Sequence, residues 1–514
     1  METVTISKVE YESLIAEKAH LERQVDYLLE QMRLARHRQF GSSSEKSEYD
    51  AEQLNLFNEA EIFATPEVVE PELVEVEKHY RKRTRLTTDK FPDDIPVEIV
   101  EHELPESEQA CPQCGESLHV MGRETIRKEL VIIPARVKIR EHVRNTYACR
   151  HCEQTNTTVP VIQAPVPKAV IPGGFASPEA VAHVMTQKFV MGVPLYRQEQ
   201  EWQRQGIKLS RQTISNWVIR ATENWLVPIY EALKTQLLSR EVLHADETTL
   251  QVLREPGKTA QSKSYMWLYR TGGDAETPIV LYEYQPDRKA LRAQEFLKPF
   301  QGYLHADGYE GYHRLQDSIK VVGCWAHARR KFDEALKSAP EQGREGSLSL
   351  AGKRYCDRLF DLERNFAGLS ADQRYARRQE ASKPLMEEFF AWAETSGALP
   401  KTLIGKAVHY LLSQRKYLER YLLDGRLEIS NNRAERSMKP FVIGRKNWLF
   451  ANTPSGAKAS AVAYSIIETA KENGLNPFDY LVYVFKQAPN LDLLNPLHVE
   501  SLLPRANCNP AAFL

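Results

Sequence analysis

Residues 242–249, VLHADETT, and residues 303–311, YLHADGYEG, carry the same tripeptide directly after a short apolar run. A short apolar run that is closed by polar or turn-forming residues is typical of a buried β-strand. The two stretches therefore predict two strands, which deliver Asp246 and Asp307 near their ends. If these strands lie side by side, the two carboxylates converge, and like charges so close together need a divalent cation or a proton between them.

Alternation along the first strand predicts which side chains share the site. Successive side chains of a strand point to opposite faces of its sheet. We therefore expect Asp246 to share a face with His244 and Thr248, and Glu247 to point to the other face.

The residues around the two aspartates predict the rest of the fold. Strand-like runs cover residues 265–269, 278–282 and 319–325, and a helix-like segment covers residues 288–300. The order is then three strands, a helix, a strand, a helix and a strand, which is the plan of the ribonuclease-H-like fold. In that fold the first and fourth strands are neighbours. The expected fold class is a multidomain α+β chain whose ribonuclease-H-like α/β core carries a helical insertion.

A third carboxylate is expected on a later helix, within residues 429–440. Ser430 or Asn431 can cap the start of this helix, and Pro440 should disturb its continuation. Glu435 lies four residues after Asn431 and faces the same way. The adjoining stripe carries Asn432, Arg436 and Lys439. A carboxylate ringed by amide and cationic side chains suits a metal ion beside a phosphate backbone.

Composition limits the classes of protein that the chain can represent. Its 514 residues should hold two to four domains, and no apolar run approaches the length of a membrane span. Seven cysteines, an odd count with two close pairs, are unlike a secreted disulfide framework, so the expected compartment is the cytoplasm. The net charge is −1, but residues 45–77 hold eleven acidic residues against one lysine, so the remainder carries about +9. That basic remainder is compatible with a nucleic-acid partner.

The N-terminal residues show a heptad pattern. Leu14, Leu21 and Leu28 recur every seven residues, and residues 11–32 supply the other core positions. The pattern predicts a short coiled coil that joins two chains, and the alternative is an amphipathic helix packed on its own protein. The acidic segment that follows is expected to be a solvated linker.

Two Cys-x2-Cys knuckles follow, formed by Cys111, Cys114, Cys149 and Cys152. Four thiolates from two knuckles satisfy tetrahedral Zn²⁺ in a closed structural site. The spacing therefore predicts one structural zinc ion, and independent thiols are the alternative. Residues 125–143, between the knuckles, alternate like a β-hairpin.

Residues 206–218 predict a turn followed by a helix that Ser210 caps. This pattern resembles the second half of a helix-turn-helix, and a simple packing helix is the alternative. The side chains expected to be exposed on this helix, and to contact DNA, are Arg211, Gln212, Ser215 and Asn216.

Taken in order, these motifs resemble the insertion-sequence-66 family of transposases, whose catalytic domain is of the DDE type. The resemblance covers nearly the whole length of the chain. Its motifs are FGSSSE at 40–45, the two knuckles, PLYRQE at 194–199, HADET at 244–248, HADGY at 305–309, CWAHARRKF at 324–332 and NNRAER at 431–436.

The resemblance implies that Asp246, Asp307 and Glu435 are a catalytic triad that holds two Mg²⁺ or Mn²⁺ ions. The implied reaction is DNA cleavage at the ends of an insertion sequence, followed by transfer of the freed 3′-hydroxyl into target DNA. The implied partners are double-stranded DNA and two small accessory proteins encoded beside the transposase. A homodimer or higher oligomer is expected, in the bacterial cytoplasm at the nucleoid. Further candidates for contacts to the DNA backbone, unless they merely carry surface charge, are His327, Arg329, Arg330 and Lys331.

The expected domain limits are a coiled coil at 1–44, a linker at 45–104, a zinc-binding module at 105–160, a helical DNA-binding region at 161–235, the catalytic core at 236–332 and 426–485, a helical insertion at 333–425 and a tail at 486–514. Two other functions remain open. One is a catalytically silent DNA-binding regulator derived from a transposase, against which the intact triad argues. The other is a nuclease that acts on RNA–DNA hybrids, against which the appended modules argue.

Overall fold

The computed structural model describes residues 17–18, 137–148, 154, 161–340 and 343–505. The chain divides into two compact units, one of Met1–Gly41 with Pro165–Leu514 and one of Ser42–Ala164. No helix in the described part of the chain is both long enough and apolar enough to cross a membrane.

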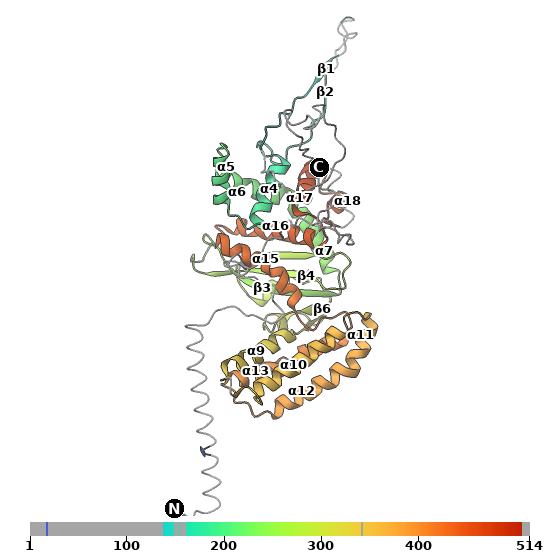
Figure 1. The fold of residues 1–514 in the computed structure, drawn as a ribbon. Coiled ribbons are helices and arrows are strands. Elements are labelled where there is room, and N and C mark those ends of the chain that lie inside the picture. The colour runs from blue at the N-terminus through green and yellow to red at the C-terminus, as the bar shows by residue number, and fades with distance from the viewer. Residues whose placement is uncertain (1–16, 19–136, 149–153, 155–160, 341–342, 506–514) are drawn as a thin grey trace, which may run out of the picture. The chain divides into compact units, whose positions relative to one another are not determined.

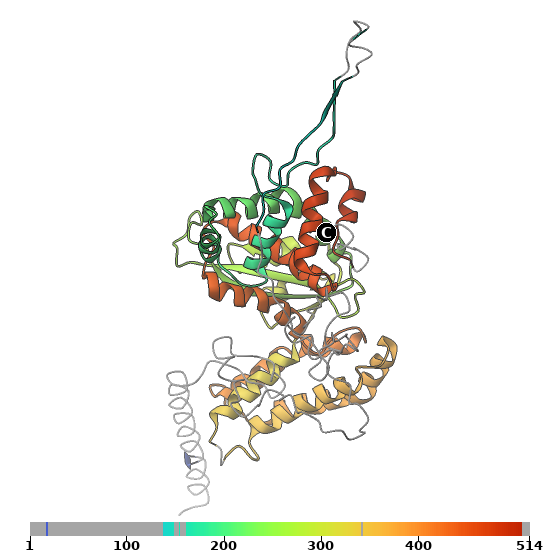
Figure 2. The ribbon, with the colours of Figure 1, turned by 45° about the horizontal axis from the view of Figure 1, so that its top comes forward.

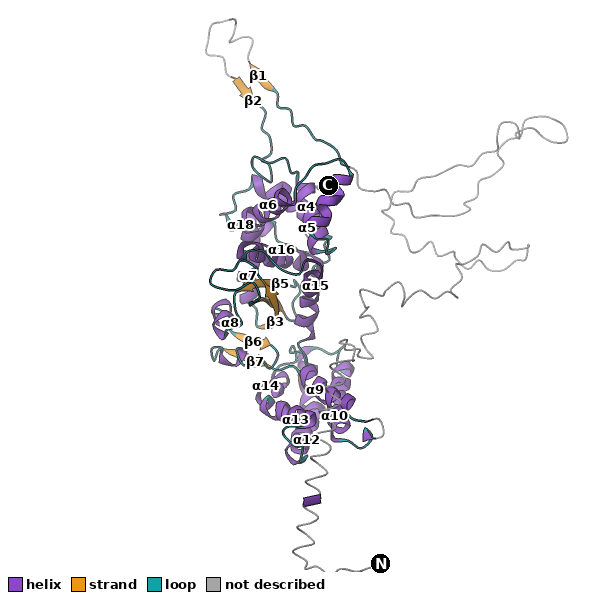
Figure 3. Ribbon diagram, turned by 90° about the vertical axis from the view of Figure 1, so that its left-hand side faces the viewer, coloured by secondary structure: helices purple, strands orange, loops and turns teal. Residues whose placement is uncertain are grey.

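A five-stranded mixed sheet lies at the centre of the larger unit, with strand order β5-β4-β3-β6-β7 (Figure 3). Strand β3 is antiparallel to β4 and parallel to β6. The bounds are β3 (Val242–Gln251), β4 (Lys263–Thr271), β5 (Val280–Gln285), β6 (Gly302–His305) and β7 (Ile319–Val322). The predicted strands are thus confirmed, and the first and fourth strands of the sheet are neighbours as expected. The predicted helix at 288–300 is present as the shorter α8 (Ala290–Phe296).

Two details of the predicted order are wrong. Between β6 and β7 the chain forms only a 3-10 turn, η4 (Tyr312–Arg314), because this segment is short and is interrupted by glycines at 308 and 311. Strand β7 ends at Val322 rather than continuing to residue 325. The next backbone N–H, that of Gly323, leaves the sheet and donates to the Tyr417 carbonyl (2.9 Å).

Helices that precede the sheet in the sequence and helices that follow it pack together around it (Figure 2). Those before it are α4 (Pro178–Phe189), α5 (Leu195–Arg204), α6 (Arg211–Ala221), η3 (Thr222–Leu226) and α7 (Val227–Leu238). Those after the helical segment are α15 (Asn432–Trp448), α16 (Pro454–Glu472), α17 (Pro477–Gln487), η8 (Ala488–Asn490) and α18 (Pro496–Ser501). These helices and the sheet share one hydrophobic core.

Helix α16 covers the edge strand β5 with hydroxyl groups. The Tyr282 N–H donates to Ser465 Oγ (2.7 Å), and the Val280 N–H donates to Thr469 Oγ1 (3.0 Å). Serine and threonine four residues apart thus satisfy two edge donors that would otherwise face another strand. The small residues of this helix, such as Ala461, allow its close approach.

A purely helical segment separates β7 from α15, and Figure 1 shows it as a bundle of its own. It comprises α9 (Trp325–Ser338), α10 (Leu348–Asn365), α11 (Ala371–Arg377), η6 (Arg378–Ser382), α12 (Lys383–Thr395), α13 (Leu403–Ser413), α14 (Arg415–Leu418) and η7 (Glu419–Leu423). Aromatic residues such as Trp325, Phe332 and Phe389 form its separate core.

The guanidinium of Arg378 ties this bundle together. It is 1 % exposed and donates to both carboxylate oxygens of Glu363 (2.9 and 2.7 Å). It also donates to the carbonyls of Tyr421, Asp424 and Leu427 (2.9, 2.9 and 2.8 Å). All five of its N–H groups are therefore used.

We expect Arg378→Lys to lower the free energy of unfolding by about 3 kcal/mol, because lysine has three donors and leaves buried acceptors unpaired. Urea denaturation would measure the loss. The matched control is Arg377→Lys, since Arg377 forms only an exposed pair with Glu380 (3.1 Å) and should contribute less than about 1 kcal/mol. Equal losses in the two variants would contradict this role of Arg378.

In the smaller unit, β1 (Thr146–Ala148) pairs antiparallel with β2 (Val161–Gln163). Strand β1 ends directly before the second cysteine knuckle. Of the hairpin predicted at 125–143, the structure describes residues 137–143, and these lie outside any strand. The coiled coil, apart from residues 17–18, and all four knuckle cysteines lie outside the described residues.

Candidate active site

Asp246 and Asp307 lie at the same level on neighbouring parallel strands. Asp307 follows the end of β6 by two residues, as predicted. The predicted place of Asp246 near the end of its strand is wrong, because β3 stays paired with β4 as far as Gln251 and Asp246 lies in its middle. The register pairs His244 of β3 with His305 of β6. Asp246 and Asp307 each follow that pair by two residues, and equal steps along parallel strands keep side chains level. The repeated tripeptide of the sequence is therefore one structural layer that occurs twice.

The two histidines of this layer form a buried platform behind the aspartates. Their rings stack with centroids 4.3 Å apart, and both are fully buried. Burial lowers the pKa of His244 to about 3 and that of His305 well below its usual range, so both rings are neutral. Two neutral rings can stack without repulsion, which fixes the spacing of β3 and β6 below the site.

Asn431 fastens the start of α15 to β3. Its Nδ2 donates to the Ala245 carbonyl (2.8 Å), and its Oδ1 therefore accepts from His244 Nδ1 (2.9 Å). Its backbone N–H donates to Cys324 Sγ (3.1 Å). Asn431, one of the two residues predicted to cap α15, is its N-cap residue. Its side chain, however, bonds to β3 rather than to its own helix. Glu435, in the first turn, is thereby held beside β3.

The prediction that Pro440 would disturb this helix is wrong, because α15 continues to Trp448. Proline has no N–H, so one bond of the helical ladder is missing. The acceptor that loses its helical donor is the Arg436 carbonyl, four residues before the proline. The Tyr282 hydroxyl donates to the next carbonyl, that of Ser437, and so ties this turn of the helix to β5. Met438 and Phe441 are buried on either side, and their packing outweighs the lost bond.

Strand alternation near Asp246 is as predicted. On its face, His244 contacts Asn431, and Thr248 Oγ1 lies 3.4 Å from the Arg445 guanidinium, which also belongs to α15. Glu247 points to the other face, where its carboxylate is almost fully buried.

Glu247 nevertheless belongs to the surroundings of the site. It accepts from Arg288 Nε (2.7 Å) and from the Tyr312 hydroxyl (2.5 Å). The same guanidinium reaches to 3.9 Å from Asp307 Oδ2 and lies over the Tyr309 ring at 4.0 Å. Arg288 therefore links the carboxylate of Glu247 to that of Asp307.

The carboxylates of the site repel one another. Burial raises the pKa of Asp246 well above its usual range, and the negative charges of Glu247, Asp307 and Glu435 raise it further. The Arg330 guanidinium lies 3.6 Å from Glu435 Oε2, and His327 Nδ1 lies 3.9 Å from Glu435 Oε1. Its Oε1 is buried without a hydrogen-bond partner among the residues that the structure describes.

These features fit a divalent cation. A cation would satisfy the unpaired Glu435 oxygen and would favour the charged form of Asp246. Carboxylate oxygens are the ligands preferred by Mg²⁺ and Mn²⁺ rather than by Zn²⁺. The donor set of Asp246, Asp307 and Glu435 thus has the chemistry that such an ion requires.

A second grouping includes the same glutamate. Within the described part of the chain, one set of three metal-binding side chains has ligand atoms within 4.8 Å of one another, formed by Cys324, His327 and Glu435. Burial raises the pKa of the Cys324 thiol to about 11, and its sulfur already accepts the Asn431 N–H. The sulfur of Cys324 therefore bonds to the start of α15, and Glu435 is the member of this set that also belongs to the carboxylate site.

The residues predicted to contact DNA lie on three helices. On α6, Ser210 caps the helix as predicted, since its Oγ accepts from the Thr213 N–H (3.2 Å). Arg211, Gln212 and Asn216 are exposed, whereas Ser215 is half-buried, which corrects its expected exposure. Helices α5 and α6 are consecutive and in contact, as a helix-turn-helix requires.

On α9 the four predicted residues diverge. His327 and Arg330 turn towards Glu435, as described above. Arg329 bonds to Asp357 of α10 (2.5 Å), and the Lys331 ammonium lies 4.8 Å from the centre of the Tyr410 ring. On α15, Arg436 and Lys439 are exposed, and Asn432 is half-buried.

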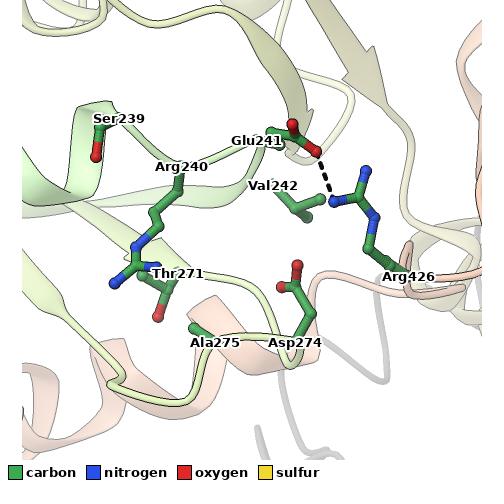
Figure 4. Close-up of a pocket in the computed structure, with 8 residues that line it drawn as sticks. All are labelled: Ser239, Arg240, Glu241, Val242, Thr271, Asp274, Ala275 and Arg426. Carbon is green, nitrogen blue, oxygen red and sulfur yellow. Dashed lines mark hydrogen bonds and ion pairs between the residues drawn. The ribbon is translucent and has the colours of Figure 1, made fainter.

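A cavity of about 230 Å³ lies at the start of β3 (Figure 4), and neither Asp246 nor Asp307 lines it. Glu241 and Arg426 form an ion pair of 2.6 Å beside it, which links the strand to the segment just before α15. Its lining residues are Ser239, Arg240, Glu241, Val242, Thr271, Asp274, Ala275 and Arg426. Two acidic and two basic side chains line it, and none of Asp246, Asp307 and Glu435 does.

Comparison with known proteins identifies the family. Residues 173–459 match the family described as "Transposase IS66 family". The chain belongs to the IS66 transposase family. Other parts of it match three further descriptions of this family: "zinc-finger binding domain of transposase IS66" at 108–153, "Transposase C of IS166 homeodomain" at 27–100 and "IS66 C-terminal element" at 465–504.

Two relatives of this IS66 chain occur in Sinorhizobium fredii. The chain is 32 % identical to the uncharacterized protein y4hP over 418 residues, which cover 78 % of this chain and 74 % of the other. It is 33 % identical to the uncharacterized protein y4jD over 415 residues, which cover 78 % of each. The family resemblance seen in the sequence motifs is therefore confirmed.

Sequence reasoning assigned no role to several residues of this site. Arg288 lay inside a predicted helix, and His244 and His305 were seen only as part of a repeat. For the two histidines a signal was available in the repeated tripeptide. Two copies of one pattern on neighbouring strands predict that equivalent side chains lie side by side. The contacts of Arg288 had no local signal.

Proposed function

We propose that this IS66 family transposase cuts DNA at the ends of an insertion sequence and joins the freed ends to target DNA. Two observations carry the proposal. Asp246 and Asp307 lie level on paired strands. The charges of Asp307 and of Glu435, which lies on a helix that Asn431 holds against β3, both act on Asp246. Such a constellation serves phosphoryl transfer, because catalysis of that reaction consists mainly of positioning and charge stabilisation.

The arrangement of the sheet supports a ribonuclease-H-like core. Three antiparallel strands are followed by two parallel ones, and the first strand lies centrally beside the fourth. We propose this fold assignment together with the domain limits expected from the sequence, in which helices α10 to α14 form an insertion into the core.

Asp246, Asp307 and Glu435 would hold divalent ions, Mg²⁺ or Mn²⁺. When bound, these ions supply a lowered pKa for the attacking hydroxyl and charge neutralisation at the leaving oxygen. In the first step water attacks the phosphorus, the bond to the 3′-oxygen breaks, and that oxygen takes up a proton. In the second step the 3′-hydroxyl loses its proton as it attacks a target phosphodiester. The bond from that phosphorus to the target's 3′-oxygen breaks, and this oxygen takes up a proton.

Other residues of the chain would position the nucleic acid. The exposed Arg436 and Lys439 follow Glu435 along α15 and suit phosphate contacts. Arg211, Gln212 and Asn216 on α6 suit recognition of the element's end, with Ser215 contributing less because it is half-buried. Of the α9 residues, Arg330 and His327 lie close enough to Glu435 to act at the site, whereas Arg329 is occupied by Asp357.

The direct test is incubation of the purified full-length protein with a labelled end fragment of the element and Mg²⁺. Cleavage at the end of the element is expected. The second candidate, a silent DNA-binding regulator, predicts binding of the same fragment without cleavage, also when the accessory proteins are added.

The remaining partners belong to the same proposal. The heptad residues 11–32 would join chains into a dimer or higher oligomer, and two small accessory proteins would act with the transposase at the nucleoid. The match of residues 108–153 to a zinc-finger description supports a structural zinc ion on Cys111, Cys114, Cys149 and Cys152.

We expect the purified chain to contain about one Zn²⁺, following the four-ligand rule for structural sites, and Cys111→Ser to lose it. Metal analysis of the dialysed protein measures both. Cys508→Ser is the control, because Cys508 has no neighbouring cysteine in the sequence, and it should keep the metal. Zinc retained in full by Cys111→Ser would contradict the four-cysteine site.

A further inference from the structure

The exposed face of α15 forms a cationic stripe that leads away from Glu435. Exposed residues recur at Arg436, Lys439, Ile443 and Lys446, at the three- and four-residue steps of one helix face. Glu435 is the only acidic residue between Asn432 and Trp448. A polyanion that contacts the carboxylate site would therefore be attracted along this stripe to the end of the helix.

The helix ends in a strained turn. Leu449 has φ 64° and ψ −49°, and it is the only non-glycine residue with positive φ in the described part of the chain. The Phe450 N–H donates to the Trp448 carbonyl (2.8 Å), which closes a γ-turn of the rare positive-φ form. Such a conformation is costly for a residue with a side chain, and glycine would adopt it freely.

Among the residues that the structure describes, little packs against the leucine side chain to compensate this strain. Leu449 is 64 % exposed and Phe450 is 42 % exposed. Leu449 has a backbone conformation that favours glycine, and its side chain is mostly exposed to solvent. This combination indicates a contact with another molecule.

The turn is held firmly on both sides. Before it, Trp448 packs edge-on against Phe441, with ring centroids 5.6 Å apart. After it, the Ala451 N–H donates to the Gln251 carbonyl (2.9 Å), and the Ala451 carbonyl accepts from the Leu253 N–H (3.0 Å). The two apolar side chains are thus presented on a rigid support continuous with β3, the strand that carries Asp246.

We infer that Leu449 and Phe450 form an apolar wedge that inserts between base pairs of the DNA bound along α15. The inference rests on the proposed function. Cations beside the wedge, Lys446 on the helix and the exposed Arg254, match phosphates on either side of an opened base step. Apolar side chains flanked by cations are the means by which proteins unstack and kink duplexes.

Helix geometry predicts where the wedge acts. Leu449 follows Glu435 by fourteen residues, which corresponds to about 20 Å along a helix. At 3.4 Å per base pair, the opened step lies roughly six base pairs from the phosphate that is cut.

The experiment uses end fragments with the fluorescent base 2-aminopurine placed at successive positions, and full-length protein without added Mg²⁺ so that the DNA stays intact. A severalfold rise in fluorescence is expected near the sixth base pair with wild-type protein. Leu449→Gly should lose most of that rise while its melting temperature equals or exceeds that of the wild type, because glycine removes both the wedge and the strain. Phe450→Ala should reduce the rise as well, and Leu494→Ala, an exposed leucine elsewhere, should retain it.

Several outcomes would overturn the wedge. One is a fluorescence rise that Leu449→Gly retains in full. Another is a melting temperature of that variant below that of the wild type, which would show that the leucine packs internally. Loss of self-association in Leu449→Gly with unchanged DNA fluorescence would assign the turn to a protein contact. A gel shift of the same fragments separates the two proposals. Wild-type protein that binds no end fragment removes the proposed function, whereas binding without any fluorescence change removes only the wedge.

Discussion

Asp246→Asn, Asp307→Asn and Glu435→Gln should each reduce DNA cleavage and strand transfer by at least ~10³-fold, while binding to the element's ends survives. Each change keeps the shape of the side chain but removes a negative charge that a divalent ion requires. Loss of a single electrostatic stabiliser alone costs ~10²–10³-fold in rate. Under the proposed function, specific binding should depend on other parts of the chain, including α6 and the cationic face of α15.

Cleavage of a labelled end fragment, measured beside a gel shift of the same fragment, tests this expectation. The matched control is Asp317→Asn, which makes the same chemical change at an exposed position before β7 and should cut at the wild-type rate. Glu247→Gln is unsuitable as a neutral control, although Glu247 points away from Asp246. Its carboxylate holds Arg288, which also reaches Asp307, so the variant should have intermediate activity.

Two results would contradict the assignment. Cleavage at the wild-type rate by any of the three triad variants would remove that residue from the catalytic set. A wild-type chain that binds ends but never cuts them, even with the accessory proteins, would favour the regulator.

Asn431→Ala should lower the cleavage rate about 100-fold, because Asn431 positions the helix that carries Glu435 and a displacement of about 1 Å can cost that much. It should also lower the free energy of unfolding by about 2–3 kcal/mol. The variant leaves the Ala245 carbonyl and His244 Nδ1 buried without partners. Urea denaturation and the end-cleavage assay measure the two effects separately.

Asn473→Ala is the control for stability alone. Asn473 also makes two hydrogen bonds to carbonyls, those of Pro278 and Thr469 (both 2.8 Å), but it lies at the end of α16. This variant should lose stability without losing the rate of cleavage by the folded protein. If Asn431→Ala, assayed where it is fully folded, cuts as fast as Asn473→Ala, then Asn431 does not position the site.

Local patterns in the sequence were sufficient to predict the strands and the three carboxylates. An apolar run closed by a polar residue reports burial directly, and the repeat around His244 and His305 reports a shared layer. The course of α15 through Pro440 was not predictable, because it depends on the burial of Met438 and Phe441 against parts of the chain that are distant in sequence. The ties of Asn431 to β3 were equally hidden, since they depend on which elements meet in three dimensions. The Asp246, Asp307 and Glu435 roles remain a prediction that the variants above test.

The bond between His244 and Asn431 joins residues 187 positions apart, so the order of synthesis matters. All five strands of the sheet lie within residues 242–322 and leave the ribosome well before α15. At 5–20 residues per second, the interval between the two bonded residues is ~10–40 s. During that time the nascent chain can pair its strands and bring two aspartates together, but it lacks the third carboxylate. Each newly made molecule thus passes through a period in which its sheet can be complete while its chemistry is not.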